Sequence, residues 1–306
     1  MELGFVGLGR MGMGMVLRLL AGGHRVTVYD VEAARVDEAA AIGATAASSV
    51  EELARLLNPP RTIWVMVPAG SAVDEVIFEG LLPYVQAGDL VIDGGNSHHK
   101  DSMRRALALQ EKGIHFLDVG TSGGLEGVKN GLAIMVGGER EAFERARPIF
   151  ETLAAPNGYG YVGGAGAGHF VKTVHNGIEY AILQAYGEGF DLLRQGPFPL
   201  DLADVARIWN NGSVVRSWLL ELAQRALEKD PTLQEIAPEV GGGETGKWAL
   251  EAALESEVPF STLALALAMR FRSRQADSFA AKLIAALRWE FGGHAITAAT
   301  PASAGE

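Results

Sequence analysis

One short stretch of the chain places four side chains with acid–base or hydrogen-bonding chemistry at helical spacing. Lys172, His175 and Glu179 follow one another at intervals of three and four residues, and Asn176 adjoins His175. At 3.6 residues per turn, these positions fall within roughly 100° of arc on a helix. A base, an imidazole, an amide and a carboxylic acid would then share one polar stripe. An exposed helix face with a Lys–Glu pair has the same spacing, so the pattern alone leaves both interpretations open.

Two neighbouring features favour a catalytic stripe over a solvated one. The glycine-rich segment 163–168 directly precedes it, and we interpret this segment as the join between two domains, where clefts form. Asn176-Gly177 lies in the middle of the expected helix, where a glycine costs about 1 kcal/mol relative to alanine. A helix that accepts this cost is expected to be closely packed or functional at that point.

The beginning of the chain carries a phosphate-binding pattern. Residues Gly7-Leu8-Gly9-Arg10-Met11-Gly12 fit G-x-G-x-x-G between a predicted strand and a predicted helix. Gly7 permits a tight turn, Gly9 lets the backbone approach a pyrophosphate, and Gly12 lets the helix pack on the sheet. The free N–H groups of the helix N-terminus then face the phosphates. The alternative is a glycine turn that binds nothing, and the strand–helix context argues against it.

Asp30 lies at the end of the second predicted strand, 18 residues after the last glycine of this pattern. A carboxylate there accepts hydrogen bonds from the ribose hydroxyls of an adenosine and repels a 2′-phosphate, which favours NAD over NADP. Asp30 could instead cap a helix that starts near Val31. Arg35 is close enough in sequence to complicate the argument from charge.

Short β-rich runs alternate with helical patterns over roughly the first 160 residues. Strands are expected at Leu3–Val6, Arg25–Tyr29, Thr62–Val67, Leu90–Asp93, His115–Val119 and Leu132–Val136, and helices at Met11–Ala21, Val31–Ile42, Val50–Leu57, Ser71–Leu81 and His98–Lys112. This alternation predicts a fold of class α/β, with an N-terminal Rossmann-type, doubly wound, mainly parallel sheet.

The second half of the chain has only helical patterns. Helices are expected at Gly168–Arg194, Leu202–Asn210, Arg216–Glu228, Lys247–Ser256 and Ser261–Phe291. We therefore expect a dinucleotide-binding domain over 1–163, an all-helical domain over 164–300 and a disordered tail over 301–306.

Composition excludes several classes of function. The sequence has 37 acidic and 26 basic residues, a net charge of −11, which argues against a broad nucleic-acid surface. It has no cysteine, so disulfides, thiolate nucleophiles and cysteine-ligated metals are excluded. His98 and His99 are adjacent and lack the spacing of zinc ligands on a helix, so no metal is expected. No apolar run reaches the ~18 residues of a membrane span and no signal peptide is recognisable, which predicts a cytoplasmic protein.

Taken together, the motifs resemble those of 6-phosphogluconate dehydrogenases, within the β-hydroxyacid dehydrogenase superfamily. The resemblance covers nearly the whole chain and rests on Gly7–Gly12, on Ile92-Asp93-Gly94-Gly95-Asn96-Ser97, on Gly120-Thr121-Ser122-Gly123-Gly124 with Gly127, on Lys172-Thr173-Val174-His175-Asn176-Gly177-Ile178-Glu179-Tyr180 and on Phe291-Gly292-Gly293-His294. It implies oxidation of 6-phosphogluconate with NAD, followed by loss of carbon dioxide to give ribulose 5-phosphate. Lys172 would take the proton of the substrate's 3-hydroxyl, and Glu179 would protonate the enediol.

The resemblance also assigns the binding residues. Asn96, Ser122, Gly123, Gly124, His175 and Asn176 would hold the carboxylate and hydroxyls of the sugar acid; Tyr180, Thr245, Arg270, Arg288 and His294 would hold its phosphate; and Val67, Pro68 and Asn96 would join Gly7–Gly12 and Asp30 around the cofactor. In the family the last Arg and His come from a partner subunit, so a homodimer or homotetramer with an extensive helical interface is expected. Arg270 is crowded by Arg272 and Arg274 and could simply be solvated.

Two departures from the family pattern leave alternatives open. The segment Gly243-Glu244-Thr245-Gly246-Lys247-Trp248 has a glycine where family members commonly have a phosphate-binding Lys, and it has a glutamate beside it. The chain also has room for only one copy of a helical domain that longer members duplicate. A dehydrogenase of a short, unphosphorylated 3-hydroxy acid is one alternative, and a non-catalytic dinucleotide-binding protein is another. The first would not need Glu179, and the second would not need Lys172.

Overall fold

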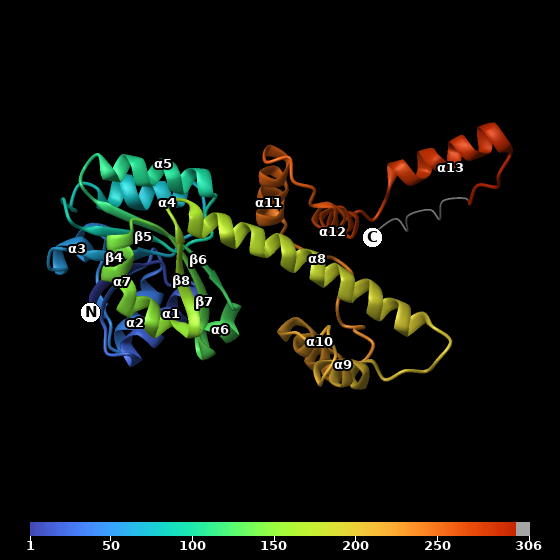
Figure 1. The fold of residues 1–306 in the computed structure, drawn as a ribbon, viewed down its shortest axis with the longest axis horizontal. Coiled ribbons are helices and arrows are strands. Elements are labelled where there is room, and N and C mark those ends of the chain that lie inside the picture. Colours follow the sequence, from blue (N-terminus) through green and yellow to red (C-terminus); the bar gives the residue numbers. More distant parts are fainter. Residues whose placement is uncertain (298–306) are drawn as a thin grey trace, which may run out of the picture. The chain divides into compact units, whose positions relative to one another are not determined.

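The computed structural model describes residues 1–297, which form two compact units (Figure 1). The first unit comprises Met1–Glu179 together with Glu244–Pro259. Among the described residues, the second comprises Tyr180–Gly243 and 260–297. The tail expected at 301–306 and the end of the helical domain expected at 164–300 lie outside the described residues. None of the helices in the described part is both long and apolar enough to cross a membrane.

The first unit is built on an eight-stranded sheet with the strand order β3-β2-β1-β4-β5-β6-β7-β8. Its strands are β1 Glu2–Val6, β2 Arg25–Tyr29, β3 Thr45–Ala46, β4 Thr62–Val65, β5 Leu90–Asp93, β6 His115–Ser122, β7 Leu132–Gly138 and β8 Ala154–Gly163. Neighbouring strands are parallel except for β6 and β7, which are antiparallel. The mainly parallel, doubly wound class predicted from the sequence is therefore confirmed.

Helices cover both faces of the sheet, because the inner strands are apolar on both sides. Phe5 and Trp64 join the core on one face with side chains of α1 and α7, whereas their neighbours Val6 and Val65 join the core on the other face. Each strand thus contributes alternate residues to two cores, as strand geometry requires. The helices of this unit are α1 Arg10–Ala21, α2 Ala33–Ala41, α3 Val50–Leu56, α4 Ser71–Asp74 with the π-helix Glu75–Leu81, α5 His99–Gln110, α6 Gly124–Asn130, α7 Arg140–Leu153, the first turns of α8 Ala167–Gln195, and α11 Glu244–Glu255.

The second unit is helical, as the sequence predicts. It contains the rest of α8, α9 Leu202–Asn210, α10 Trp218–Lys229, α12 Ser261–Arg272 and α13 Phe279–Gly292. The single helix expected over Ser261–Phe291 is wrong, since α12 ends at Arg272 and α13 begins at Phe279. The Ser278 hydroxyl accepts a hydrogen bond from the Ala281 N–H, so a new N-cap interrupts the continuous apolar pattern.

Several elements of the first unit carry little signal in the sequence. Strand β8 contains a proline and several glycines, which are weak strand formers, and it lies at the sheet edge, where pairing on one side suffices. Helix α7 contains Pro148, and α6 begins at a glycine. Helix α11 starts at Glu244, so Thr245 lies in a first helical turn instead of the expected loop.

The first turn of α8 is held against strand β6 at very short range. Both carboxylate oxygens of Asp118 in β6 cap the helix: Oδ1 accepts from the Gly166 N–H at 2.7 Å, and Oδ2 accepts from the His169 N–H at 2.8 Å. A Cβ on Gly168 would lie 2.2 Å from the Asp118 carbonyl oxygen, and a Cβ on Gly120 would lie 2.4 Å from the Lys172 Cβ. Only glycine fits at either position, and helix and strand approach each other backbone to backbone.

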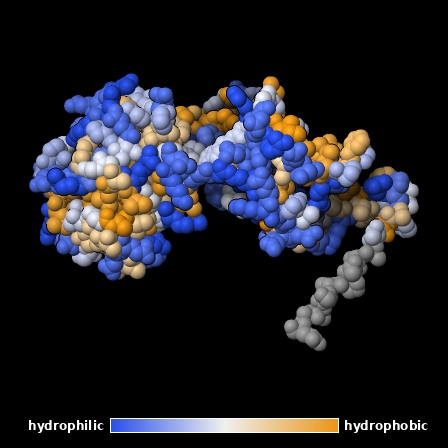
Figure 2. All heavy atoms as spheres, turned by 90° about the horizontal axis from the view of Figure 1, so that it is seen from below, coloured by the Kyte–Doolittle hydropathy of each residue, from blue (hydrophilic) through white to orange (hydrophobic). Residues whose placement is uncertain are grey.

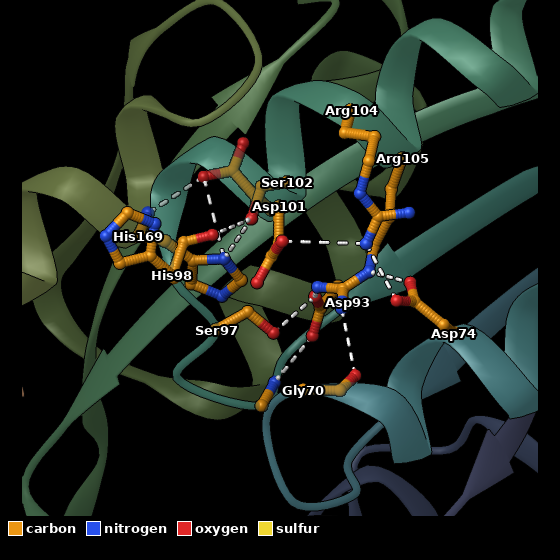
Figure 3. A network of polar contacts seen from close by, with 12 residues as sticks. Gly70, Asp74, Asp93, Ser97, His98, Asp101, Ser102, Arg104, Arg105 and His169 are labelled. Atoms are coloured by element: carbon orange, nitrogen blue, oxygen red, sulfur yellow. Dashed lines mark hydrogen bonds and ion pairs between the residues drawn. The ribbon is translucent and has the colours of Figure 1, made fainter. Parts of the chain in front are cut away.

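A buried polar contact ties the same helical turn to α5. His169 is 1% exposed, and its Nδ1 lies 2.7 Å from the hydroxyl oxygen of Ser102, which is fully buried (Figure 3). His169 Nδ1 also lies 4.0 Å from Asp118. These residues hold the start of α8 between the sheet and α5, so its orientation on the first unit is fixed.

This close packing gives a test of the fold. Gly120→Ala should destabilise the protein by about 1–3 kcal/mol or more, because the new methyl group meets the Lys172 Cβ and α8 must move. Gly160→Ala in β8 is the matched control, since a Cβ there meets nothing within 4 Å. Chemical denaturation of the two variants measures the difference, and equal stabilities would contradict the packing described.

Candidate active site

Lys172 lies on the second turn of α8 and is 7% exposed. Burial lowers the pKa of its ammonium from 10.5 to about 8, while the negative charge of Glu179 acts in the opposite direction. Removal of the charged form from water is the dominant cause. A substantial fraction of Lys172 is therefore neutral near physiological pH and able to accept a proton.

The other residues of the polar stripe extend from Lys172 as a connected set of contacts. Lys172 Nζ lies 3.5 Å from His175 Nδ1, and His175 Nε2 lies 3.1 Å from the Ser122 hydroxyl at the end of β6. The Asn176 Oδ1 lies 3.1 Å from His175 Nδ1, and the Asn176 Nδ2 donates to the Thr245 hydroxyl at 3.2 Å. Strand β6, helix α8 and helix α11 thus each contribute polar groups to one cluster in the first unit.

Glu179 lies at the outer end of this cluster. Its Oε2 is 3.9 Å from His175 Nδ1, the same nitrogen that Lys172 Nζ approaches. The Glu179 side chain is 35% exposed, so it is only partly buried within this chain.

The turn after Ser122 leaves its backbone open to a ligand. Gly123 has φ +124° and Gly124 has φ +55°, both in the region that favours glycine. Gly123 is the N-cap of α6 and makes no side-chain cap, and a Cβ on Gly124 would meet nothing within 4 Å. The open backbone of this turn suits the approach of a carboxylate or hydroxyl next to Lys172.

The Gly7–Gly12 loop has the geometry of a phosphate cradle. Gly7 has φ +101°, and a Cβ there would lie 2.3 Å from the Met66 carbonyl oxygen. A Cβ on Gly12 would lie 2.1 Å from the Gly7 carbonyl oxygen, whereas a Cβ on Gly9 would meet nothing within 4 Å. Gly9 is the N-cap of α1 and makes no side-chain cap, so the first N–H groups of the helix remain for a ligand. The loop therefore fits the pyrophosphate of a dinucleotide.

Asp30 supports this loop directly. Its Oδ2 accepts a hydrogen bond from the Leu8 N–H at 2.6 Å, and its Oδ1 accepts from the Glu32 N–H at 2.9 Å. Helix α2 begins only at Ala33, so the alternative in which Asp30 caps a helix from Val31 is wrong. Arg35 lies 3.8 Å from Asp30 and 2.9 Å from Glu32, so its charge is shared between two carboxylates. The carboxylate retains lone pairs for ribose hydroxyls.

Asn96, Val67 and Pro68 lie in the segments that follow strands β5 and β4. Parallel strands of a sheet of this type place their carboxyl ends at the ligand-binding edge. Asn96 and Pro68 are exposed there, and a Cβ on Gly95 would lie 2.5 Å from the Val67 carbonyl oxygen. The two segments thus touch beside the Gly7–Gly12 loop, whose Gly7 contacts Met66.

The remaining predicted phosphate residues belong to the second unit. Tyr180 follows Glu179 directly in α8, and the guanidinium carbon of Arg270 lies 3.8 Å from the centre of its ring. Arg270 also donates to the Gly241 carbonyl at 2.9 Å, so it is an ordered side chain rather than the solvated one that its crowded sequence context allowed. Arg288 in α13 and His294 just beyond it are exposed.

Some residues of the site region were missed from the sequence. Asp118 carries the best available signal, because it is a carboxylate within an otherwise apolar strand. Its pKa is raised by burial, which its two backbone hydrogen bonds and the nearby His169 partly offset. Trp248 in α11 packs edge-on against His98, with 5.2 Å between the ring centres, and Glu255 in the same helix forms an ion pair with Lys100. These two contacts anchor the helix that carries Thr245. The described residues hold no group of three or more His, Cys, Asp or Glu suited to a metal ion.

Known proteins match this chain over nearly its whole length. Residues 2–164 match the NAD binding domain of 6-phosphogluconate dehydrogenase, and residues 168–286 match the 6-phosphogluconate dehydrogenase C-terminal domain. A Haloferax volcanii protein named 6-phosphogluconate dehydrogenase, NAD(+)-dependent, decarboxylating, is 47% identical, over 97% of this chain and 98% of its own length.

Longer relatives match over part of their length. The decarboxylating 6-phosphogluconate dehydrogenase of Haemophilus influenzae is 39% identical, over 86% of this chain and 57% of its own length. The structure of the Plasmodium falciparum 6-phosphogluconate dehydrogenase, described as apo and in complexes with NADP+ and with 6-phosphogluconate, aligns with a TM-score of 0.83 at 30% identity, covering 99% of this chain and 67% of that one. This chain therefore belongs to the 6-phosphogluconate dehydrogenase family.

Proposed function

We propose that the protein oxidises 6-phosphogluconate with NAD and decarboxylates the product to ribulose 5-phosphate. The observation that carries this proposal is the buried Lys172, with a pKa lowered to about 8, in contact with His175 and beside Ser122, Asn176 and Glu179. Family membership supplies the substrate class, since the relatives of matching and of greater length carry the name of this activity.

The chemistry assigned to the chain's own residues is proton transfer and binding. Neutral Lys172 takes the proton of the 3-hydroxyl while the hydride leaves carbon 3. Bound NAD supplies the hydride acceptor. The 3-keto acid then loses carbon 1 as carbon dioxide, and protonated Lys172 returns its proton to the 3-oxygen, which gives an enediol. Hydrogen-bond donors from Ser122, His175 and Asn176 stabilise the charge that develops in this step. Glu179 delivers a proton to the former carbon 2, which becomes carbon 1 of ribulose 5-phosphate, while the hydroxyl proton of the enediol returns to Lys172.

Substrate and cofactor groups are assigned to the residues that the family pattern indicates. We assign the sugar carboxylate and hydroxyls to Asn96, Ser122, Gly123, Gly124, His175 and Asn176, the phosphate to Tyr180, Thr245, Arg270, Arg288 and His294, and the dinucleotide to Gly7–Gly12, Asp30, Val67, Pro68 and Asn96. Glu244 is the first residue of α11, where a negative charge favours the helix N-terminus, which gives this departure from the family pattern a structural role.

The reaction is tested with paired substrates. NAD reduction is followed at the nicotinamide absorbance with 6-phosphogluconate and with gluconate, and released carbon dioxide is measured. We expect turnover with the phosphorylated acid only. Turnover with gluconate or with a short 3-hydroxy acid instead would overturn the proposal in favour of a dehydrogenase of unphosphorylated acids.

The base assignment predicts the pH dependence. Because Lys172 acts when neutral, kcat/KM should rise with pH, about tenfold per unit on the acid side, and level off above a pKa of about 8. Lys172→Met should lower kcat by about 10²–10⁴-fold. Fluorescence titration should show unchanged NADH binding, and the exposed Lys112→Met is the control. A Lys172→Met enzyme with wild-type turnover contradicts the assignment.

Preference for NAD is assigned to the charge of Asp30. Asp30→Asn keeps an oxygen for the Leu8 or Glu32 N–H but removes the charge that repels a 2′-phosphate. We expect the ratio of kcat/KM for NAD over NADP to fall by about tenfold or more, as removal of one charge contact implies. Asp37→Asn, at an exposed position in the following helix α2, should leave the ratio unchanged. An unchanged ratio in the Asp30 variant would show that cofactor choice lies elsewhere.

A homo-oligomer in which the C-terminal residues complete a neighbouring site is also proposed. Helix α13 has no buried residue, although it carries many large apolar side chains. The exposed ones include Phe279 (77% exposed), Ile284 (59%), Leu287 (53%), Trp289 (50%) and Phe291 (76%). Apolar patches also lie open on the molecular surface in Figure 2. A helix this apolar requires a covering partner, and a second copy of the chain provides one.

Subunit mixing tests this arrangement. Lys172→Ala and Arg288→Ala should each be inactive alone. Co-expressed in equal amounts they should regain about a quarter of wild-type activity, because half of the dimers are mixed and each of these has one intact site. Size-exclusion chromatography with light scattering gives the assembly state. A mixture no more active than its components contradicts the shared site.

A further inference from the structure

Arg105 on α5 is the largest buried charge that the proposed reaction does not use. Its side chain is 0% exposed, although it lies near the ligand-binding edge of the sheet. Figure 3 shows its guanidinium among Gly70, Asp74 and Asp93, which come from the segments after β4 and at the end of β5. A guanidinium held away from water requires partners for its donors, and their identity indicates what it does.

Each nitrogen of the guanidinium donates to a different partner. Nε donates to Asp74 Oδ1 in α4 at 2.7 Å, and Nη1 donates to Asp93 Oδ2 at the end of β5 at 3.2 Å. Nη2 donates to the Gly70 carbonyl, after β4, at 3.0 Å. Arg105 therefore fastens α5 to the two segments that follow β4 and β5.

Asp93, which Arg105 holds, forms hydrogen bonds with the residues on both sides of Asn96. Its Oδ1 accepts from the Gly95 N–H at 3.1 Å, and its Oδ2 accepts from the Ser97 hydroxyl at 2.8 Å. Ser97 is 1% exposed, whereas Asn96 between them is exposed. The backbone on both sides of Asn96 is thus held by one carboxylate, and that carboxylate is held by Arg105.

We propose that Arg105 is a positioning residue that acts on the reaction through Asn96. The inference rests on the proposed function, in which Asn96 meets both substrate and cofactor and Val67 and Pro68 line the cofactor. Arg105 has no role in proton transfer. It fixes where the Asn96 amide and the segment after β4 lie, and it neutralises Asp93 beside the site.

The planar fork of arginine is needed for this role. Its donors point in fixed directions and satisfy Asp74, Asp93 and the Gly70 carbonyl together. A lysine would preserve the positive charge but would present one compact ammonium group, which cannot hold all three acceptor groups at these distances. Arg105→Lys therefore keeps the positive charge at this position but removes the hydrogen bonds that hold the neighbouring segments.

A double-mutant cycle distinguishes positioning from general stability. Arg105→Lys should lower kcat/KM for 6-phosphogluconate by about 10–100-fold in the wild-type background, and by less than about 3-fold in the Asn96→Ala background. Equal losses in both backgrounds would show a merely structural role and overturn the proposal. Thermal unfolding of each variant is recorded alongside.

The matched control is Arg104→Lys. Arg104 also pairs with Asp74 and with Asp101, but its side chain is 51% exposed. This variant should change kcat/KM by less than about twofold in either background. A loss of kcat/KM as large as that of Arg105→Lys would show that activity depends on the ion pairs with Asp74 and not on the hydrogen bond from Arg105 to Asp93.

A second variant keeps the inference testable if Arg105→Lys does not fold. Ser97→Ala removes only the hydroxyl that Asp93 holds, and we expect a smaller loss, about 3–10-fold, which again disappears in the Asn96→Ala background. A Ser97→Ala loss that persists there overturns the proposal. Wild-type turnover of 6-phosphogluconate is measured first, so that a wrong proposed function is distinguished from a wrong positioning role for Arg105.

Discussion

The site depends on how closely the start of α8 can approach strand β6. Gly120 and Gly168 allow backbone contact where any side chain would collide, and Asp118 satisfies the N–H groups of the helix start that this contact takes out of water. Lys172 is buried as a result, and burial lowers its pKa toward the physiological range. The property that makes this lysine a base is thus a consequence of packing, and no neighbouring positive charge is needed to explain it.

The remaining polar groups are arranged outward from that contact. Ser122 lies at the end of β6, His175 and Asn176 lie one turn beyond Lys172, and Thr245 reaches Asn176 from α11. On the cofactor side, Asp30 holds the Gly7–Gly12 loop through Leu8, while Arg105 and Asp93 hold the segments on which Val67 and Asn96 lie. In both regions a buried charged side chain holds a glycine-containing segment in place.

Much of the fold and of the candidate site could be predicted from the sequence, because the local sequence patterns agree with the tertiary structure. The alternation of strands and helices, the G-x-G-x-x-G turn and the stripe from Lys172 to Glu179 are each periodic or motif-like. Other features have no local signature. Strand β8 is an edge strand rich in glycine, the break between α12 and α13 rests on one serine cap, and the roles of Asp118 and Arg105 arise from residues distant in sequence. The hydrogen bond from the Leu8 N–H to Asp30 has no local signature either, since the two residues lie 22 positions apart.

The central claim, that burial on β6 converts Lys172 into a base, is tested most directly by measuring the pKa of this lysine itself. In protein labelled with carbon-13 and nitrogen-15 lysine, NMR follows the Lys172 side-chain resonances against pH, with a Lys172→Arg variant to assign them. The account predicts a midpoint near pH 8. A midpoint near the ordinary lysine value of about 10.4 would contradict it.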